Sequence, residues 1–287
     1  MLNPTQLIQI DTWLRQCANT IILPRFNNLA AHESYEKAPD DYATIADIEA
    51  EAFLTPLLQS LIDGSLVVGE ETVAERPQIY AQLGTAPNVW VLDPLDGTGS
   101  FRKGVPNFGT LLSLVQHGQV VAGWLYHIPQ DKIYVVQKGQ GVSCDGKQII
   151  LPDINKPLEM AFKISRKSAA VLGAFPHGAE RVAQLEQALE QFADIKPSSP
   201  SVVDFIAMIN GELDAIFYTG SNPWDYLPGL LAVQELGGAC AKINGAAIAG
   251  EALHQHAQWS AFCRDPALLT QLQTALAPLE RQFSQGI

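Results

Sequence analysis

An apolar segment that ends abruptly in two aspartates constrains this chain more than any other feature. Residues 89–92 read Val-Trp-Val-Leu, which is typical of a buried β-strand, and Asp93-Pro94-Leu95-Asp96-Gly97-Thr98 follows at once. Two carboxylates three positions apart repel each other unless a cation lies between them. Carboxylate oxygens and a turn carbonyl are the ligands that Mg²⁺ prefers. The segment therefore predicts a buried strand with a divalent-cation site at its end.

The two residues after the second aspartate add a candidate anion site. Gly97 and Thr98 read as the start of a helix or tight turn, whose free backbone N–H groups are able to hold a phosphate. A polar loop with a helix-capping residue produces the same letters and needs no ligand. This segment alone does not distinguish the two interpretations.

Two further acidic clusters favour the metal site. Gly69-Glu70-Glu71 follows another apolar strand, and Asn222-Pro223-Trp224-Asp225 places an aspartate at the start of an apolar helix, where capping is its ordinary role. Only 17% of the residues are charged, so three carboxylate clusters at strand ends or helix starts are not expected by chance. Glu71 is expected to point away from Glu70, since neighbouring residues of a strand face opposite sides.

The hydrophobic pattern predicts one compact domain made of two unlike halves. Residues 1–155 read as an α+β half with an antiparallel sheet, and residues 156–287 as a wound α/β half that contains Asp225. The helices expected are 3–21, 44–61, 180–192, 201–209, 225–236 and 266–283, and the strands are 65–68, 88–92, 110–116, 119–126, 132–137, 215–218, 240–243 and 259–263. His117-Gly118 fits a tight hairpin turn, and Gly237-Gly238 a helix stop.

The charge balance limits the partners. Eighteen Lys and Arg against 30 Asp and Glu give a formal net charge of -12, which disfavours nucleic acid and anionic membranes. A small anionic substrate fits only where metal ions reverse the local field. No signal peptide or apolar run of about 20 residues is visible, and the cysteines lack zinc-ligand spacing, so we expect a cytoplasmic protein. His254 and His256 lie in a polar stretch and are expected to face solvent.

The order and spacing of these clusters resemble the inositol monophosphatase family of Mg²⁺-dependent, lithium-sensitive phosphatases. The resemblance rests on Gly69-Glu70-Glu71, Asp93 to Thr98 with Phe101, Trp224-Asp225 and Glu235-Leu236-Gly237-Gly238, and also on Thr44, Asp47, Gly139-Gln140-Gly141, Asp145-Gly146 and residues 211–215. It implies a layered αβαβα sandwich and two to three Mg²⁺ ions.

The resemblance also implies a role for each matching residue. Glu70, Asp93 and the Leu95 carbonyl would bind the first ion, Asp93, Asp96 and Asp225 the second, and Glu70 would help to hold a third. Glu70 and Thr98, supported by Asp47, would deprotonate the attacking water, and Asp96 and the amides of Gly97 and Thr98 would contact the phosphate. Four carboxylates, a phosphate dianion and three Mg²⁺ sum to zero charge, so an acidic protein is able to bind this substrate.

Substrate selectivity is expected to differ from that of inositol-selective relatives. Where those relatives have Gly-Ser-Ala at a helix start, this chain has Ser199-Pro200-Ser201, and Tyr218 stands where they have an acidic residue. Ser201 and Tyr218 are therefore candidate substrate-binding residues. The expected reaction is hydrolysis of inositol 1-phosphate or a related sugar or polyol phosphate. Histidinol phosphate, fructose 1,6-bisphosphate and 3'-phosphoadenosine 5'-phosphate are alternative substrates, and a non-catalytic regulatory protein is the alternative of another class. A homodimer is implied by the resemblance alone.

Overall fold

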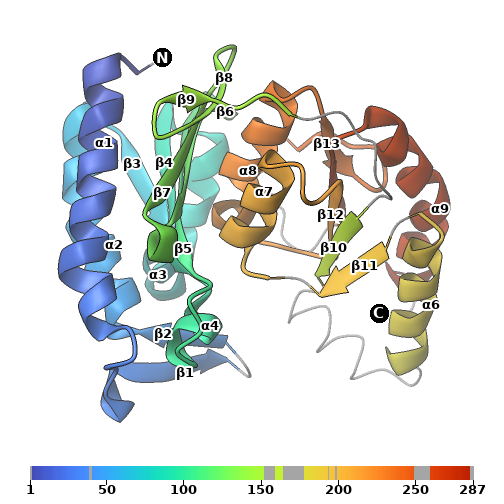
Figure 1. The fold of residues 1–287 in the computed structure, drawn as a ribbon, viewed down its shortest axis with the longest axis horizontal. Coiled ribbons are helices and arrows are strands. Elements are labelled where there is room, and N and C mark those ends of the chain that lie inside the picture. The colour runs from blue at the N-terminus through green and yellow to red at the C-terminus, as the bar shows by residue number, and fades with distance from the viewer. Residues whose placement is uncertain are drawn as a thin grey trace.

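Helices and strands alternate in five layers (Figure 1). The computed structural model describes residues 2–38, 41–151, 159–163, 178–192, 194–197, 199–248 and 259–284. Within these ranges, α1 and α2 cover one face of a seven-stranded sheet, and α7 and α8 lie between that sheet and a five-stranded sheet. Helices α6 and α9 cover the outer face of the second sheet. The αβαβα sandwich that the family resemblance implies is confirmed.

The large sheet is antiparallel except at one edge. Its strands run in chain order: β3 (Leu66–Gly69), β4 (Asn88–Asp96), β5 (Gly109–Gln116), β6 (Gln119–His127), β7 (Lys132–Gln137), β8 (Gly141–Cys144) and β9 (Lys147–Gln148). β3 and β4 are parallel, and each later strand is antiparallel to the one before it. His117 and Gly118 both have positive φ, 48° and 72°, as the predicted tight turn requires.

Helices α1 (Pro4–Cys17) and α2 (Ile45–Leu61) cover the outer face of this sheet. Asn3 begins α1, because its side chain accepts a hydrogen bond from the backbone N–H of Gln6. The chain continues through a π-helical turn (Ala18–Ile22) and a 3₁₀ turn (Leu23–Arg25). Buried side chains of the two helices, including Leu14 and Leu54, belong to one core cluster with Trp90 of β4 and Trp124 of β6.

The second sheet has the order β11 (Asp194–Pro197), β10 (Glu159–Lys163), β12 (Ala215–Tyr218), β14 (Ser260–Cys263) and β13 (Ala239–Lys242). The first three strands are parallel, and β14 is antiparallel to both of its neighbours. Its outer helices are α6 (Gly178–Glu190) and α9 (Pro266–Ser284). The sequence did not predict β10 and β11.

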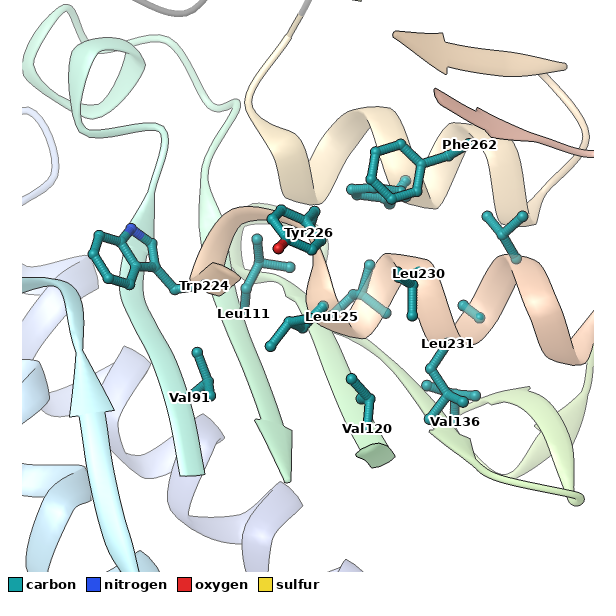
Figure 2. Close-up of a cluster of buried hydrophobic side chains, with 14 of the residues drawn as sticks. Val91, Leu111, Val120, Leu125, Val136, Trp224, Tyr226, Leu230, Leu231 and Phe262 are labelled. Carbon is teal, nitrogen blue, oxygen red and sulfur yellow. The ribbon is translucent and has the colours of Figure 1, made fainter. Parts of the chain in front are cut away.

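The middle layer joins the two sheets through a shared core. Helices α7 (Ser201–Ile209) and α8 (Pro223–Glu235) contribute side chains to one buried cluster with residues of both sheets. In Figure 2, Leu231 of α8 lies beside Val136 of the large sheet, and Phe262 of the small sheet belongs to the same cluster. α8 ends as predicted, since Gly237 has φ +86° and its N–H bonds back to the Gln234 carbonyl.

Several short elements near the ends of β3 and β4 were not predicted. They are the hairpin of β1 (Ser34–Ala38) and β2 (Asp41–Thr44), α3 (Glu70–Glu75), a 3₁₀ segment (Pro77–Gly84), and α4 (Thr98–Arg102), for which only a start was expected. No helix in the described part of the chain is long and apolar enough to cross a membrane. His254 and His256, which were expected to face solvent, lie outside the described residues.

Candidate active site

A β-bulge places the two aspartates of β4 on one side of the strand. Asp93 pairs with Leu111 of β5 and Asp96 with Gly109, so two residues of β4 lie opposite one residue of β5. In a regular strand, residues three apart point to opposite faces. The extra residue of a bulge reverses that alternation, which turns the Asp96 side chain to the side of Asp93. Both side chains are buried.

Helix α8 brings the third carboxylate to the same place. Asp225 lies in its first turn, and carboxylate oxygens of Asp93, Asp96 and Asp225 all lie within 4.8 Å of one another. Asp225 also accepts a hydrogen bond from the Asn222 backbone N–H at 2.9 Å, so its capping role and its place in the cluster coexist. The structure thus assembles three of the four predicted metal carboxylates from segments 130 residues apart.

The fourth predicted metal carboxylate, Glu70, forms an ion pair with a lysine. Glu70 Oε1 accepts a hydrogen bond from Lys37 Nζ at 2.7 Å, and Glu71 Oε1 accepts one at 3.0 Å. The expectation that Glu71 points away from Glu70 is wrong. These residues begin helix α3 and do not continue the strand, so strand alternation does not apply.

A hydroxyl–carboxylate pair lies beside the bulge. Asp47, in the first turn of α2, accepts hydrogen bonds through Oδ2 from the Thr44 backbone N–H at 2.8 Å and from Thr44 Oγ1 at 2.5 Å. Asp47 Oδ1 lies 3.0 Å from Thr98 Oγ1, which also lies 3.1 Å from the Leu95 carbonyl oxygen. The single hydroxyl hydrogen of Thr98 is donated to one of these two acceptors at a time.

The N-terminus of α7 packs against the end of β4. Asp96 Oδ2 accepts a hydrogen bond from the Val202 backbone N–H at 2.6 Å. Gly97 has φ +92°, and a Cβ built there would lie 2.7 Å from a backbone oxygen and 2.8 Å from Pro200. Only glycine fits this position without displacement.

The predicted substrate residues Ser201 and Tyr218 lie together. Both are fully buried, and their hydroxyl oxygens are 3.3 Å apart. The Tyr218 ring also packs edge-on against Phe205 and Phe262. Burial raises the pKa of Tyr218 well above its usual value, so it is a neutral hydroxyl. Contact of these residues with a substrate stays a prediction.

The carboxylates of the site oppose one another's ionisation. Burial, followed by the neighbouring carboxylates, raises the pKa of Asp93 well above its usual value. Burial also raises the pKa of Glu70, Glu71 and Asp47 to about 7 each, although the Lys37 ammonium lowers the first two. Bound cations relieve both the desolvation and the repulsion. The clustered oxygen donors therefore fit a hard divalent cation such as Mg²⁺.

These shifts predict how the stability of the metal-free protein depends on pH. In the unfolded chain the two glutamates have a pKa of 4.5 and Asp47 one of 3.8, but in the folded protein the pKa of each of the three carboxyl groups is about 7. The folded state binds more protons between these values, so stability falls as the pH rises from about 5 to 8. Thermal unfolding in EDTA should show Tm falling across this range, and saturating Mg²⁺ should flatten the slope. A constant or rising Tm in EDTA would contradict the assignment.

Sequence reasoning missed two residues around this site. Lys37 stands in a polar hairpin without a motif, so nothing local marked it. Glu51 is buried on α2 and accepts hydrogen bonds from the backbone N–H groups of Glu71 and Thr72. Its only signal is its spacing, because a residue four positions after Asp47 lies on the same face of a helix.

Known proteins resemble this chain over most of its length. Residues 3–277 match the model of the inositol monophosphatase family. The inositol-1-monophosphatase of Mesorhizobium japonicum is 26% identical over 77% of this chain and 82% of its own length. The Nus factor SuhB of Xylella fastidiosa is 26% identical over 80% of this chain and 79% of its own length.

Solved structures share the fold. An inositol monophosphatase from Thermotoga maritima superposes with a TM-score of 0.73 at 19% identity, covering 96% of this chain and 99% of the other. An inositol monophosphatase/NADP phosphatase in complex with Mg²⁺ and phosphate gives 0.73 at 18% identity, covering 93% and 95%. The fold is therefore the one found in solved inositol monophosphatases. The family model covers nearly the whole chain, so this chain belongs to the inositol monophosphatase family.

Proposed function

We propose that this protein is a Mg²⁺-dependent phosphatase that hydrolyses a small phosphate monoester. The observation that carries the proposal is the convergence of Asp93, Asp96 and Asp225 within 4.8 Å, beside the Thr98–Asp47 pair. Phosphate monoesters resist hydrolysis because an anion must be attacked while an alkoxide leaves. Bound cations neutralise negative charge on the phosphate and on the leaving alkoxide, and an oriented proton acceptor activates the attacking water.

The residues proposed to hold two to three ions are Glu70, Asp93, Asp96, Asp225 and the Leu95 carbonyl. Mg²⁺ bound to them would neutralise charge on the phosphate and make a water more acidic. The structural neighbour with Mg²⁺ and phosphate supports this choice of metal.

The chain's own groups position the reactants. When the Thr98 hydroxyl donates its hydrogen to Asp47, one of its two acceptors, its lone pairs would be directed to accept a hydrogen bond from the attacking water. Glu70 is the second proposed acceptor for the water proton. Gly97 and Thr98 lie at the N-terminus of α4, where the first N–H groups are not used by the helix itself and are available to phosphate oxygens.

Release of inorganic phosphate tests the proposal directly. The purified protein, with Mg²⁺ or with EDTA, is incubated with inositol 1-phosphate, fructose 1,6-bisphosphate, histidinol phosphate, 3'-phosphoadenosine 5'-phosphate and glycerol 2-phosphate. Mg²⁺-dependent release from at least one ester is expected. No release from any of them, with Mg²⁺ binding intact by calorimetry, would favour the regulatory alternative.

Broad substrate selectivity is a further prediction. Tyr218 offers a neutral hydroxyl where inositol-selective relatives have a carboxylate, and Pro200 lacks an N–H donor. Loss of an acceptor for substrate hydroxyls should flatten the selectivity. Structural neighbours contain inositol monophosphate in one case and 2'AMP in another, which supports the proposal. We expect kcat/KM for inositol 1-phosphate to exceed that for the other esters by less than about a hundredfold, or ~2.7 kcal/mol. A larger preference would refute this interpretation of Tyr218.

The second candidate function is regulatory, and the relatives named Nus factor SuhB favour it. All four proposed metal carboxylates are present, which supports catalysis. Lithium sensitivity, a cytoplasmic location and a homodimer remain part of the proposal, on the strength of family membership.

A further inference from the structure

We propose that Glu51 is a positioning residue that fixes the N-terminal turn of α3 and, through it, the direction of Glu70. The inference rests on the proposed function in one respect, namely that Glu70 is a metal ligand. Glu51 is itself outside the proposed ligand set. It lies on α2, and its side chain is buried.

Three hydrogen bonds tie the Glu51 carboxylate to α3. Oε2 accepts from the Glu71 backbone N–H at 2.9 Å, and Oε1 accepts from the Thr72 backbone N–H at 2.8 Å and from Thr72 Oγ1 at 2.5 Å. The first N–H groups of a helix have no acceptor within the helix, and a side chain at the N-cap usually supplies one. The N-cap of α3 is Gly69, which has no side chain. Glu51 therefore performs the capping from another helix.

Gly69 makes this contact possible. Its φ of −102° is open to any residue, so backbone strain does not require glycine here. A Cβ at this position would instead lie 2.3 Å from both Glu51 Cδ and Oε2. The Glu51 carboxylate therefore occupies the space that a side chain at residue 69 would need.

Two carboxylates on one face of α2 contact the segments that follow β4 and β3. Asp47 is a hydrogen-bond acceptor for the hydroxyl of Thr98, which follows β4. Glu51, one turn later in α2, accepts hydrogen bonds from the backbone N–H groups of Glu71 and Thr72, which follow β3. β3 and β4 are parallel neighbours, with Gly69 paired to Leu92. Helix α2 thereby sets the position of the Glu70 segment relative to the aspartates of β4.

Mg²⁺ binding to Glu51→Gln, measured by isothermal titration calorimetry, tests the inference. The amide keeps the volume but replaces one acceptor oxygen with an NH₂ group that faces N–H donors. Groups that orient metal ligands typically change metal affinity by about 10- to 100-fold when altered, so we expect the Mg²⁺ Kd to rise at least about tenfold. Glu49→Gln is the matched control, because Glu49 lies on the same helix, is half-exposed and pairs with Arg25; its Kd should stay unchanged.

A purely structural role predicts a different result. In that case Glu51→Gln would lower Tm in EDTA but leave the Mg²⁺ Kd within twofold of wild type, and this outcome overturns the inference. Calorimetry measures Mg²⁺ binding without turnover. If the protein binds Mg²⁺ but hydrolyses no ester, the proposed function is refuted, and the Kd of Glu51→Gln still decides the role of Glu51. If Glu51→Gln does not fold, Glu51→Asp, which keeps the charge, is measured in its place against the same criterion.

A double-mutant cycle tests the contact with Gly69. Gly69→Ala should raise the Mg²⁺ Kd at least fivefold, because the new Cβ displaces the carboxylate. In the Glu51→Ala background the space is free, so adding Gly69→Ala should change the Kd by less than twofold. Equal effects of Gly69→Ala in both backgrounds would show that the 69–51 contact does not orient the site.

Discussion

Replacing Asp93 with asparagine is expected to reduce Mg²⁺-dependent phosphate release by at least about a thousandfold. Asp93 is the one side chain proposed to contact both the first and the second ion, and an amide there halves the acceptor oxygens and removes a charge. The change is structurally conservative. Asp93 Oδ1 accepts a hydrogen bond from the Leu95 backbone N–H at 3.1 Å, and an asparagine Oδ1 keeps this bond and the bulge.

The same substitution should make the metal-free protein more stable. Burial and the neighbouring carboxylates raise the pKa of Asp93, so its charge opposes folding at neutral pH. Asp93→Asn should therefore have a higher Tm than wild type in EDTA at pH 7.5, while its activity is lost. Asp63→Asn, an exposed change after α2, should leave both properties unchanged. Near-normal turnover of Asp93→Asn at saturating Mg²⁺ would refute the proposed site.

Local sequence indicated candidate site residues where acidic side chains follow the end of a strand or begin a helix. An apolar run followed at once by Asp93 and Asp96 indicates both the strand and the ligands, and Asp225 follows a recognisable helix start. The structure brings the carboxylates of Asp93, Asp96 and Asp225 together, and their role as metal ligands stays a prediction. The bulge that makes convergence possible was not predicted, because it depends on the pairing of β4 with β5.

The parts that sequence did not predict depend on contacts between distant segments. Residues 66–69 form an apolar strand, and Glu70 and Glu71 read as its continuation. The chain turns into helix α3 instead, with its first amides accepted by Glu51, twenty residues earlier. A partner so distant leaves no local pattern. Lys37 is likewise one lysine in a polar hairpin, and only folding places its ammonium on Glu70 and Glu71.

Thr98 and Asp47 are expected to act as one unit in turnover, and removal of either should lower kcat by about 10²- to 10³-fold. In the proposed mechanism Asp47 accepts the hydroxyl hydrogen of Thr98, so the hydroxyl oxygen would present its lone pairs to the attacking water. Thr98→Ala removes the acceptor for the water. Asp47→Asn keeps the hydroxyl but leaves its orientation to the Leu95 carbonyl, which lies 3.1 Å from Thr98 Oγ1.

Kinetics of the two single variants, the double variant and Thr98→Ser measure this coupling. If the two groups form one relay, the double variant should be about as slow as Thr98→Ala, because Asp47 has no role in turnover once the hydroxyl is gone. Thr98→Ser should recover most of the rate, since the hydroxyl is retained. Asp47 also accepts hydrogen bonds from Thr44 at the start of α2, so a lower Tm of Asp47→Asn in EDTA is expected independently of kcat. If the two losses in kcat multiply in the double variant, the hydroxyl and the carboxylate contribute separately. If Thr98→Ser is as slow as Thr98→Ala, the attacking water is oriented by other groups.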